Sequence, residues 1–444
     1  MKMKLRETNA FRILIFAALI FILAGCGGKT EPSVSAPSEN NAGQPVKGEI
    51  TLTTYYEDAF LNEAAKIFSE QNPDTPVKIN VYKPVDGAND TDAVEMYVTY
   101  INTALASGTA DDILVMSNLP YYRYSDSLTD LAPYMQTGFS EQDYITRLFK
   151  VLDENGKRYT LPIDFYMEMF AFHEDYAEHF GSTISFSACN EIGRNLIDNL
   201  GGTQNFSLYN YDGFSLFFNA FSVNYHRLID FPGKKSNLKN GELLKMFNDF
   251  KNLENDDYIP TSQEFFDMEI PDNYLAQYSS TANLTLLIGY DKPFTETALI
   301  TGEGGEVYYG TFTQLGINDS SKNKEAAWQF VAFLLSEQMQ SSPQLPALPI
   351  NKNALRQSTK RELEEMNQTR KANGMYINED LDSLTNAAAE KIESWASRAQ
   401  YFSYFEPIVT NVVFEEGYDF FLGNSSAEDV INIIDNKISL YLAE

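Results

Sequence analysis

Between residues 50 and 116, short runs of strand character alternate with stretches of helical periodicity, and this order limits the folds open to the chain. The first helical stretch runs from Phe60 to Phe68 and stops before Pro73, and the second is closed by Gly108. The runs of strand character lie at 50–56, 77–81 and 113–116. This order predicts right-handed crossovers and a mostly parallel sheet.

Ligands of such sheets bind beyond the carboxyl ends of the strands. In this chain the first strand is followed by Tyr55, Tyr56 and Glu57, and the third by Ser117 and Asn118. We therefore expect these side chains to lie at a binding edge.

Later patterns are more varied. Residues 175–280 are mostly helical in pattern, with Gly and Asn breaks, and Pro343, Pro346 and Pro349 predict an extended crossing. Further strands are predicted at 156–162, 167–173, 284–289 and 312–317.

Two helices are predicted with their caps. One begins after Ser321 or Asn323, and its buried stripe is Ala327, Phe330, Val331, Leu334 and Leu335. The last begins after Ser426, which forms an approximate capping box with Asp429. Its predicted inner face is Val430, Ile433, Ile434, Ile438 and Tyr441.

The N-terminal segment has the marks of a secretory signal peptide: basic residues, an apolar run at 13–23 and small residues before Cys26. The apolar run is shorter than the roughly 20 residues that a membrane-spanning helix needs. Leu-Ala-Gly-Cys at 23–26 resembles a bacterial lipobox, which predicts lipidation of Cys26; an ordinary signal peptide with an incidental Cys is the alternative. Residues 27–48 are rich in Gly, Ser, Pro and Asn and read as a linker. We expect a signal peptide at 1–25 and a flexible tether at 26–48.

Composition narrows the classes of partner. The formal net charge of −29 disfavours nucleic acid and anionic lipid, which bind basic surfaces, although an acidic surface without specific meaning is an equal alternative. There are two Cys, so lipidation of Cys26 would leave Cys189 alone, and we expect it to be a small buried hydrophobe.

Known catalytic motifs are missing from the sequence. There is no Gly-x-Ser-x-Gly elbow and no His-Glu-x-x-His helix. Gly28-Lys29-Thr30 lacks the earlier Gly of a phosphate-binding loop, and His173 and His179 have no Cys or second His pair to complete a metal site. We expect no cofactor, no metal and no catalytic residues, while the 62 acidic residues leave a glycosidase pair open.

Aromatic residues are the informative excess, at 14% of the chain with 31 Phe and 27 Tyr. Several stand at predicted strand ends and in loops beside Asp, Asn and Glu. Sugars suit such surfaces, because a pyranose face packs on a ring while carboxylates and amides bind the hydroxyls. The alternative is that most of these rings belong to the core or its rim.

Five segments together resemble the family 1 extracellular solute-binding proteins, the lipoprotein receptors of carbohydrate ABC importers. They are Leu-Ala-Ser-Gly-Thr-Ala-Asp-Asp-Ile at 105–113, Leu-Thr-Asp-Leu-Ala-Pro at 128–133, Gly-Lys-Arg-Tyr-Thr-Leu-Pro at 156–162, the helix start from Gly316 to Trp328, and the ending with Phe-Phe-Leu-Gly at 420–423 and Tyr-Leu-Ala-Glu at 441–444. The family Pro before the Asp-Ile strand is replaced by Ala110 or Asp111, and the second lobe lacks the Trp often found in sugar clefts.

The resemblance implies an α/β, two-lobed periplasmic-binding-protein-like fold of type II, with two mixed sheets flanked by helices, a hinge and an interlobe cleft. Lobe 1 would comprise 49–162 and 313–345, and lobe 2 would comprise 163–312 and 346–444. The chain would cross near 163–166, 308–313 and 345–349. The implied ligand contacts are Tyr55, Tyr56, Glu57 and Asn118 from lobe 1, Asp164 and Tyr166 from the crossing, and Tyr211, Asp212, Asp291, Tyr401, Phe402 and Tyr404 from lobe 2, the last three at the start of a predicted helix.

The function implied is a monomeric receptor, lipid-anchored on the extracytoplasmic face of the cell membrane. It would capture a polar solute, first of all a sugar or oligosaccharide, and deliver it to the permease subunits of an ABC importer. A peptide or another polar solute, including an amino sugar, remains open because a fold does not fix its ligand. A surface glycan-active enzyme and a sensory or adhesive lipoprotein are the alternatives from other classes.

Overall fold

A computed structural model of the chain describes residues 48–443 except 83–89, 118, 120–122, 204–205, 232, 263–272, 290–292, 376 and 404–405. Residues from Val46 onward form one compact unit. The predicted signal peptide, Cys26 and most of the tether lie outside the described residues, as do the predicted contacts Asn118, Asp291 and Tyr404. In the described part of the chain, no helix is both long enough and apolar enough to cross a membrane.

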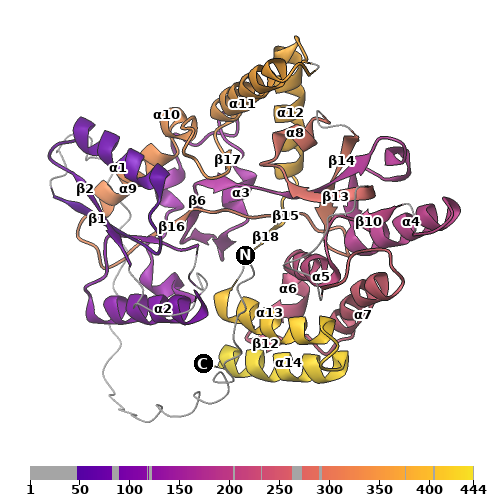
Figure 1. Cartoon of the computed structure of the whole chain (residues 1–444). Helices are drawn as coiled ribbons and strands as arrows, with labels where there is room; N and C mark the ends of the chain where they lie inside the picture. Colours follow the sequence, from indigo (N-terminus) through magenta and orange to yellow (C-terminus); the bar gives the residue numbers. More distant parts are fainter. Residues whose placement is uncertain are drawn as a thin grey trace, which may run out of the picture. The chain divides into compact units, whose positions relative to one another are not determined.

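The first sheet confirms the prediction made from the alternating patterns. β1 (Ile50–Thr54) runs parallel to both β2 (Val77–Val81) and β3 (Ile113–Val115). β16 (Gln314–Ile317) then adds antiparallel to β3, and β6 (Leu161–Pro162) pairs with β16. Two crossover helices, α1 (Ala59–Gln71) and α2 (Asp90–Ser107), join the parallel strands (Figure 1).

The second sheet is also mixed. Its strand order is β10 (Ser207–Tyr209), β13 (Tyr274–Ser280), β8 (Glu168–His173), β14 (Phe294–Thr301) and β9 (Thr183–Ser185). β8 is antiparallel to both of its neighbours, whereas the two outer pairs are parallel. Both sheets are flanked by helices, so the predicted α/β class with two mixed sheets is confirmed.

Short ladders pair the segments that run between the sheets. β7 (Asp164–Phe165) pairs with β17 (Leu348–Pro349), and β15 (Tyr308–Tyr309) pairs with β18 (Tyr401–Phe402). Two further ladders are β4 (Asp153–Glu154) with β5 (Lys157–Arg158) and β11 (Ile229–Asp230) with β12 (Lys235–Ser236). The central ladders hold together segments that are far apart in sequence.

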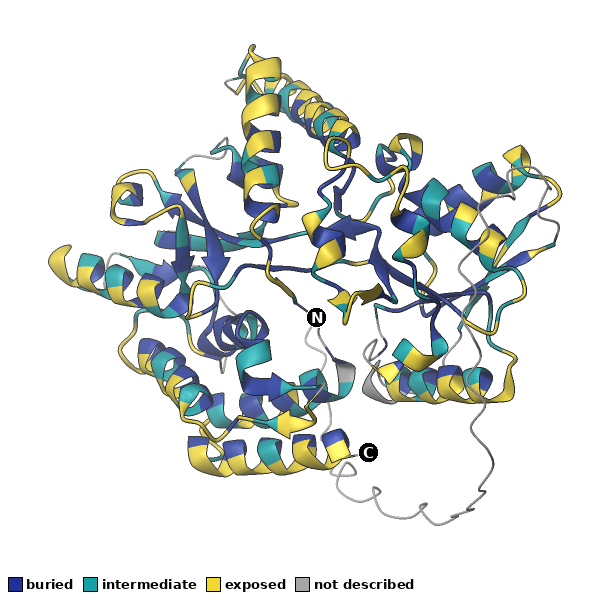
Figure 2. Ribbon diagram, turned by 180° about the vertical axis from the view of Figure 1, so that it is seen from behind, coloured by how far each residue is buried: buried dark blue, intermediate teal, exposed yellow. Residues whose placement is uncertain are grey.

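Most helices bury one face and leave the other in solvent (Figure 2). α11 (Lys352–Ala372) lies beside α12 (Leu381–Ala396), and α13 (Pro407–Phe421) lies beside α14 (Ala427–Ala443) (Figure 1). The other α-helices are α3 (Arg147–Lys150), α4 (Phe186–Asn199), α5 (Gly213–Ser222), α6 (Tyr225–Leu228), α7 (Glu242–Asn255), α8 (Leu284–Leu287), α9 (Lys324–Leu334) and α10 (Glu337–Gln340).

Both helices with predicted caps form, but no side-chain hydrogen bond caps α9 at Asn323, so only the Ser426 cap of α14 is confirmed. The buried stripe of α9 includes Phe330 and Val331, and Ser426 accepts a hydrogen bond from the backbone of Asp429 while donating to its carboxylate at 2.8 Å. Cys189 is buried, and burial raises the pKa of its thiol to about 12. Ile433 of α14 is exposed, so its predicted place on the inner face was wrong.

Two local predictions were wrong, and the mostly helical pattern at 175–280, where α4 to α7 form, was incomplete. The apolar run at 284–289 is the helix α8, because the Asn283 side chain caps it by accepting from the backbone of Leu286. The helical pattern assigned to 175–280 hides strands β9 to β13. Tyr401 and Phe402 belong to β18 and do not start a helix, since α13 begins only at Pro407.

Candidate functional site

One edge of the second sheet gathers polar and aromatic side chains. The register of β8 and β13 pairs Glu168 with Ser280, so Glu168 lies where β13 ends. Tyr211 follows β10, which is parallel to β13, and therefore lies at the same edge. Because ligands of open α/β sheets bind beyond the carboxyl ends of parallel strands, this edge is the candidate binding face.

Glu168 is the carboxylate of this edge, and it is joined to β13 and α5. Its carboxyl group interacts with the hydroxyl of Tyr278, and that hydroxyl donates to Asn219 Oδ1 at 3.1 Å. Burial raises the pKa of Glu168 to about 7, against a lowering by the bond to Tyr278.

This raised pKa predicts a pH dependence of stability. The unfolded value for Glu is about 4.3, so the folded chain holds this proton more tightly between roughly pH 4 and 7. The contribution of Glu168 to stability is therefore highest at low pH and falls as the pH rises towards 7. In urea denaturation from pH 5 to 8, we expect Glu168→Gln to gain stability relative to the wild type as the pH increases. A relative stability that stays constant over this range would contradict the assignment.

Tyr166 and Phe312 form an aromatic platform between the two sheets. Their rings stack with centroids 4.9 Å apart, and Phe312 remains 56% exposed. The Phe312 carbonyl accepts from Ser117 Oγ at 2.7 Å, which ties the platform to the residue that follows β3 in the first sheet. Tyr166 reaches its place over Gly310 because a side chain at position 310 would collide with the Tyr166 ring.

Asp164, predicted as a ligand contact, is fully buried beneath this platform. Its carboxylate accepts from the Phe312 amide at 2.8 Å, the Thr313 amide at 3.1 Å and the Thr311 hydroxyl at 3.0 Å. Burial raises its pKa to about 7 although these hydrogen bonds lower it. The geometry therefore gives Asp164 the role of holding the segment 311–313 in place.

The predicted contacts of the first sheet form a separate aromatic group. The rings of Tyr55 and Tyr56 meet edge to face at 4.2 Å, with Tyr55 buried and Tyr56 60% exposed. Tyr55 also packs against Tyr82 and Tyr97. The Glu57 carboxylate is exposed and accepts from Asn62 at 3.2 Å. Tyr56 and Glu57 are thus open to a ligand, whereas Tyr55 supports them from below.

Tyr401 belongs to a third group, around β15 and β18. Its ring stacks on His226 at 3.9 Å and on Tyr308 at 5.4 Å. His226 Nδ1 contacts the Tyr308 hydroxyl, and burial lowers the pKa of His226. Phe402, next to Tyr401, packs against Tyr309.

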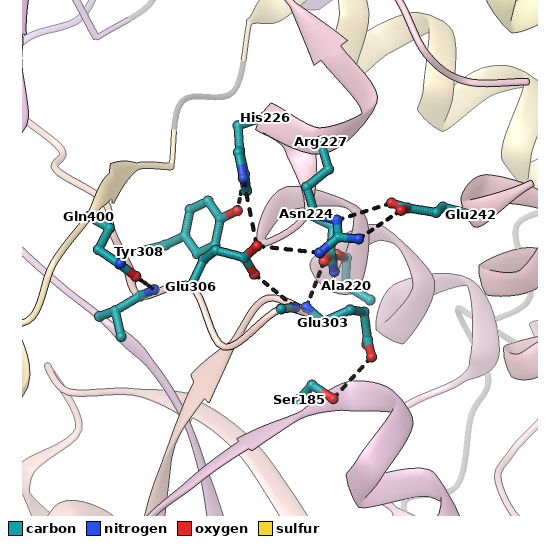
Figure 3. Close-up of polar contacts among 12 residues, drawn as sticks. Ser185, Ala220, Asn224, His226, Arg227, Glu242, Glu303, Glu306, Tyr308 and Gln400 are labelled. Atoms are coloured by element: carbon teal, nitrogen blue, oxygen red, sulfur yellow. Dashed lines mark hydrogen bonds and ion pairs between the residues drawn. The ribbon is translucent and has the colours of Figure 1, made fainter. Parts of the chain in front are cut away.

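A charged network stands behind His226 (Figure 3). The Arg227 guanidinium contacts Glu242 at 2.7 Å and Glu306 at 3.3 Å. Burial alone would raise the pKa of Glu306, but backbone amides, Arg227 and His226 leave it below its usual value. These charges satisfy one another, so we assign the network to shaping the 302–308 turn.

The remaining predicted contacts divide by accessibility. Tyr211 meets Tyr278 edge to face at 5.8 Å and joins the Glu168 group. Asp212 is buried and caps α5, accepting from the Ser215 amide at 3.0 Å and from the Ser262 hydroxyl at 3.2 Å. Its carboxylate is used within the chain, as that of Asp164 is.

The segment after β3 also contacts the last helices of the chain. Arg123 donates to the Tyr441 carbonyl at 2.8 Å, and its guanidinium lies 4.1 Å from the centre of the Tyr441 ring. The Tyr441 hydroxyl donates to the buried carboxylate of Glu406 at 2.6 Å. α2 and α13 are also in contact here.

A hollow of about 610 Å³ lies between α3, α11 and α12, away from the Tyr166 and Phe312 platform. Its charged side chains pair with one another, as Lys150 with Glu141 at 2.7 Å and Lys352 with Glu393 at 3.5 Å. The two lysines of its lining are therefore already engaged within the chain. Among the described residues, no cluster of three or more His, Cys, Asp or Glu side chains could hold a metal ion.

The sequence analysis missed Glu168, Tyr278 and Phe312. One signal was available for Glu168, since it is a carboxylate near the start of an otherwise apolar strand, where an unpaired charge is costly. Tyr278 lies on a strand that the helical pattern concealed. Phe312 was assigned to a predicted strand, but it precedes β16 and its side chain stays exposed.

The chain is similar to a known protein family and to solved structures. Residues 63–366 match the profile of a family described as bacterial extracellular solute-binding protein. A search of curated protein sequences found no match.

Solved structures share the fold at low identity. An ABC substrate-binding protein from Listeria monocytogenes in complex with cycloalternan is 15% identical with a TM-score of 0.57, over 89% of this chain and 99% of that one. The sugar-binding protein MalE from Xanthomonas citri is 16% identical with a TM-score of 0.58, over 89% and 98%. A family 1 extracellular solute-binding protein from Alicyclobacillus acidocaldarius is 16% identical with a TM-score of 0.58, over 90% and 100%.

Proposed function

This chain belongs to the bacterial extracellular solute-binding proteins, and from that membership we propose that it captures a sugar or oligosaccharide and delivers it to the permease of an ABC importer. The observation that supports a saccharide is the exposed face of Phe312 on Tyr166, next to Glu168 and Tyr211. A pyranose ring packs on such a face while carboxylate and hydroxyl groups bind its hydroxyls. The structural relative in complex with cycloalternan supports the same class of ligand.

The binding place in this proposal is the cleft between two lobes, with lobe 1 at 49–162 and 313–345 and lobe 2 at 163–312 and 346–444. Tyr166 and Phe312 would form its floor at the crossing segments. Tyr56 and Glu57 would contribute from lobe 1, and Tyr211 and Tyr401 from lobe 2. Contacts of the kind that Arg123 makes with Tyr441 would hold the lobes closed over the solute.

The cellular setting in this proposal follows from the N-terminal sequence. Cys26 would carry the lipid, and 26–48 would tether a monomer to the extracytoplasmic face of the membrane. With about 22 residues, a flexible linker has a root-mean-square reach of roughly 25 Å, which leaves the protein room to meet its permease.

We further propose that the protein is a receptor and not an enzyme. A glycosidase needs two carboxyl groups roughly 5 to 10 Å apart that are both free to act on the substrate. At the platform the two carboxyl groups are Asp164 and Glu168, and both oxygens of Asp164 accept hydrogen bonds from the chain. This occupancy favours binding without turnover. A sensory or adhesive role on the same fold would differ in having no permease partner.

The test is a thermal-shift screen of the purified protein against neutral oligosaccharides, peptides and polyamines. A ligand at a hundredfold excess over its Kd stabilises the folded state by about 2.7 kcal/mol. We expect a shift with one class of saccharide and no hydrolysis of that saccharide by chromatography. Hydrolysis of the saccharide would instead support a glycan-active enzyme. A shift with peptides alone would overturn the carbohydrate assignment and leave the receptor.

A further inference from the structure

A small cavity lies between the start of β8, the ladder of β15 with β18, and the residues before α6. Its volume is about 10 Å³, which is close to the minimum for a single water-sized group. Its lining includes Tyr166, Glu168, Tyr308, Gly310 and Ser403. We call these five residues the donor subsite, because they suit an occupant that donates hydrogen bonds.

Two oxygens of the donor subsite lack a hydrogen-bond partner in the described part of the chain. They are Glu168 Oε2 and Ser403 Oγ, and the Ser403 side chain is only 8% exposed. A buried polar atom without a partner costs about 1 to 3 kcal/mol. An occupant with more than one hydrogen to donate would remove this cost at both positions.

Among the described residues, no cation contributes to the electrostatics of Glu168. Tyr278 contacts it from β13, Tyr166 lies beside it, and the negative charge of Asp164 on β7 also acts on Tyr166. On the far wall, Tyr308 contacts His226, whose pKa burial lowers, and the neighbouring Arg227 is paired with Glu242 and Glu306. Acids and aromatic rings thus dominate the immediate surroundings.

We propose that the donor subsite binds one primary ammonium group of the solute, so that amino sugars are among the saccharides that this protein captures. The inference rests on the proposed saccharide-binding function. An ammonium group has three hydrogens, which can serve Glu168 Oε2 and Ser403 Oγ together, and its size is near that of water. A sugar hydroxyl can also serve both, by donating to Glu168 Oε2 and accepting from the Ser403 hydroxyl, but it brings no positive charge to the carboxylate.

Charge also favours ammonium over hydroxyl. A hydrogen bond between ammonium and carboxylate is roughly twice as strong as a neutral one, and the faces of tyrosine rings attract cations. When the ammonium binds, the proton of Glu168 leaves to solvent and the Tyr278 hydroxyl turns from Asn219 to the ionised carboxylate. The net charge of −29 attracts cationic solutes from a distance.

The experiment uses three disaccharides with the same β-1,4 linkage, measured by isothermal titration calorimetry. They are cellobiose, the glucosamine disaccharide with two free amines, and its di-N-acetyl form. In the wild type we expect the glucosamine disaccharide to bind at least tenfold more tightly than the other two. In Glu168→Gln and in Ser403→Ala, we expect the ratio of its affinity to that of cellobiose to fall, to about one in Glu168→Gln.

The pH dependence supplies a second readout. Because the bound form needs an ionised Glu168, we expect the affinity of the wild type for the glucosamine disaccharide to rise from pH 6 to pH 7, and Glu168→Gln to lose this rise. Equal affinities for the amine and cellobiose, or a preference that survives in Glu168→Gln, would show that water alone fills the cavity.

The outcome also separates this inference from the proposed function. If a neutral oligosaccharide from the screen binds while the glucosamine disaccharide gains nothing, the donor subsite fails and the receptor stands. If no saccharide of either kind binds, both proposals fail.

Discussion

Replacing Asp164 by alanine is expected to lower the free energy of unfolding by about 3 kcal/mol. The change removes the acceptor of the Phe312 and Thr313 amides and of the Thr311 hydroxyl. Each buried donor left without a partner costs about 1 to 3 kcal/mol, and Asp164 is fully buried, so water cannot easily replace it. The measurement is urea denaturation followed by circular dichroism.

Thr311→Ala is the matched control, since it removes only one of the three donors and leaves both amides bonded. We expect it to cost about 1 kcal/mol. If Asp164→Ala unfolds at the same urea concentration as the wild type, the carboxylate does not hold the crossing segment, and its earlier prediction as a solute contact becomes the better account.

Replacing Phe312 by alanine is expected to weaken binding of the saccharide found in the screen by roughly 30- to 100-fold. A ring that covers a pyranose contributes by burial and by stacking, together about 2 to 3 kcal/mol, and each 1.4 kcal/mol is tenfold in Kd. Phe312 is 56% exposed, so its loss leaves the core intact and the midpoint of unfolding nearly unchanged.

The control for Phe312 is Met375→Ala. Met375 is 52% exposed and follows α11, so the variant removes a surface side chain of similar exposure away from the platform. Calorimetry of both variants with the same saccharide separates the platform from a general surface effect. If Phe312→Ala binds the saccharide as tightly as Met375→Ala does, the platform is not part of the binding site.

The sequence predicted the first sheet well because its strands alternate with long amphipathic helices. Phe60, Ala64 and Phe68 of α1 become buried at the positions that helical spacing requires, and Ile67 becomes half-buried. Such periodicity is set locally, and burial in the folded state reinforces it. The same holds for α9 and for the capped start of α14.

The second sheet was poorly predicted because its strands carry weaker local signals. The partly exposed residues of β13 obtain their pairing from β8, which is more than 100 positions earlier in sequence. At 284–287, an apolar run of this length fits a strand or a buried helix, and the Asn283 cap decides between them.

The site was only partly predictable. Residues at strand ends, such as Tyr56 and Tyr211, could be placed from topology, and Tyr166 could be placed at a crossing. The carboxylates Asp164 and Asp212 could not be separated from ligand contacts, because a buried cap and an exposed acceptor have the same sequence signature. Glu168 becomes notable only when the structure shows that one of its oxygens lacks a partner.

The most direct test of the central claim is a crystal structure of the protein with the saccharide that stabilises it most. The account predicts a pyranose ring packed on Phe312, within hydrogen-bond distance of side chains at the Glu168 edge. A saccharide bound elsewhere, with the Tyr166 and Phe312 rings uncovered, would contradict it.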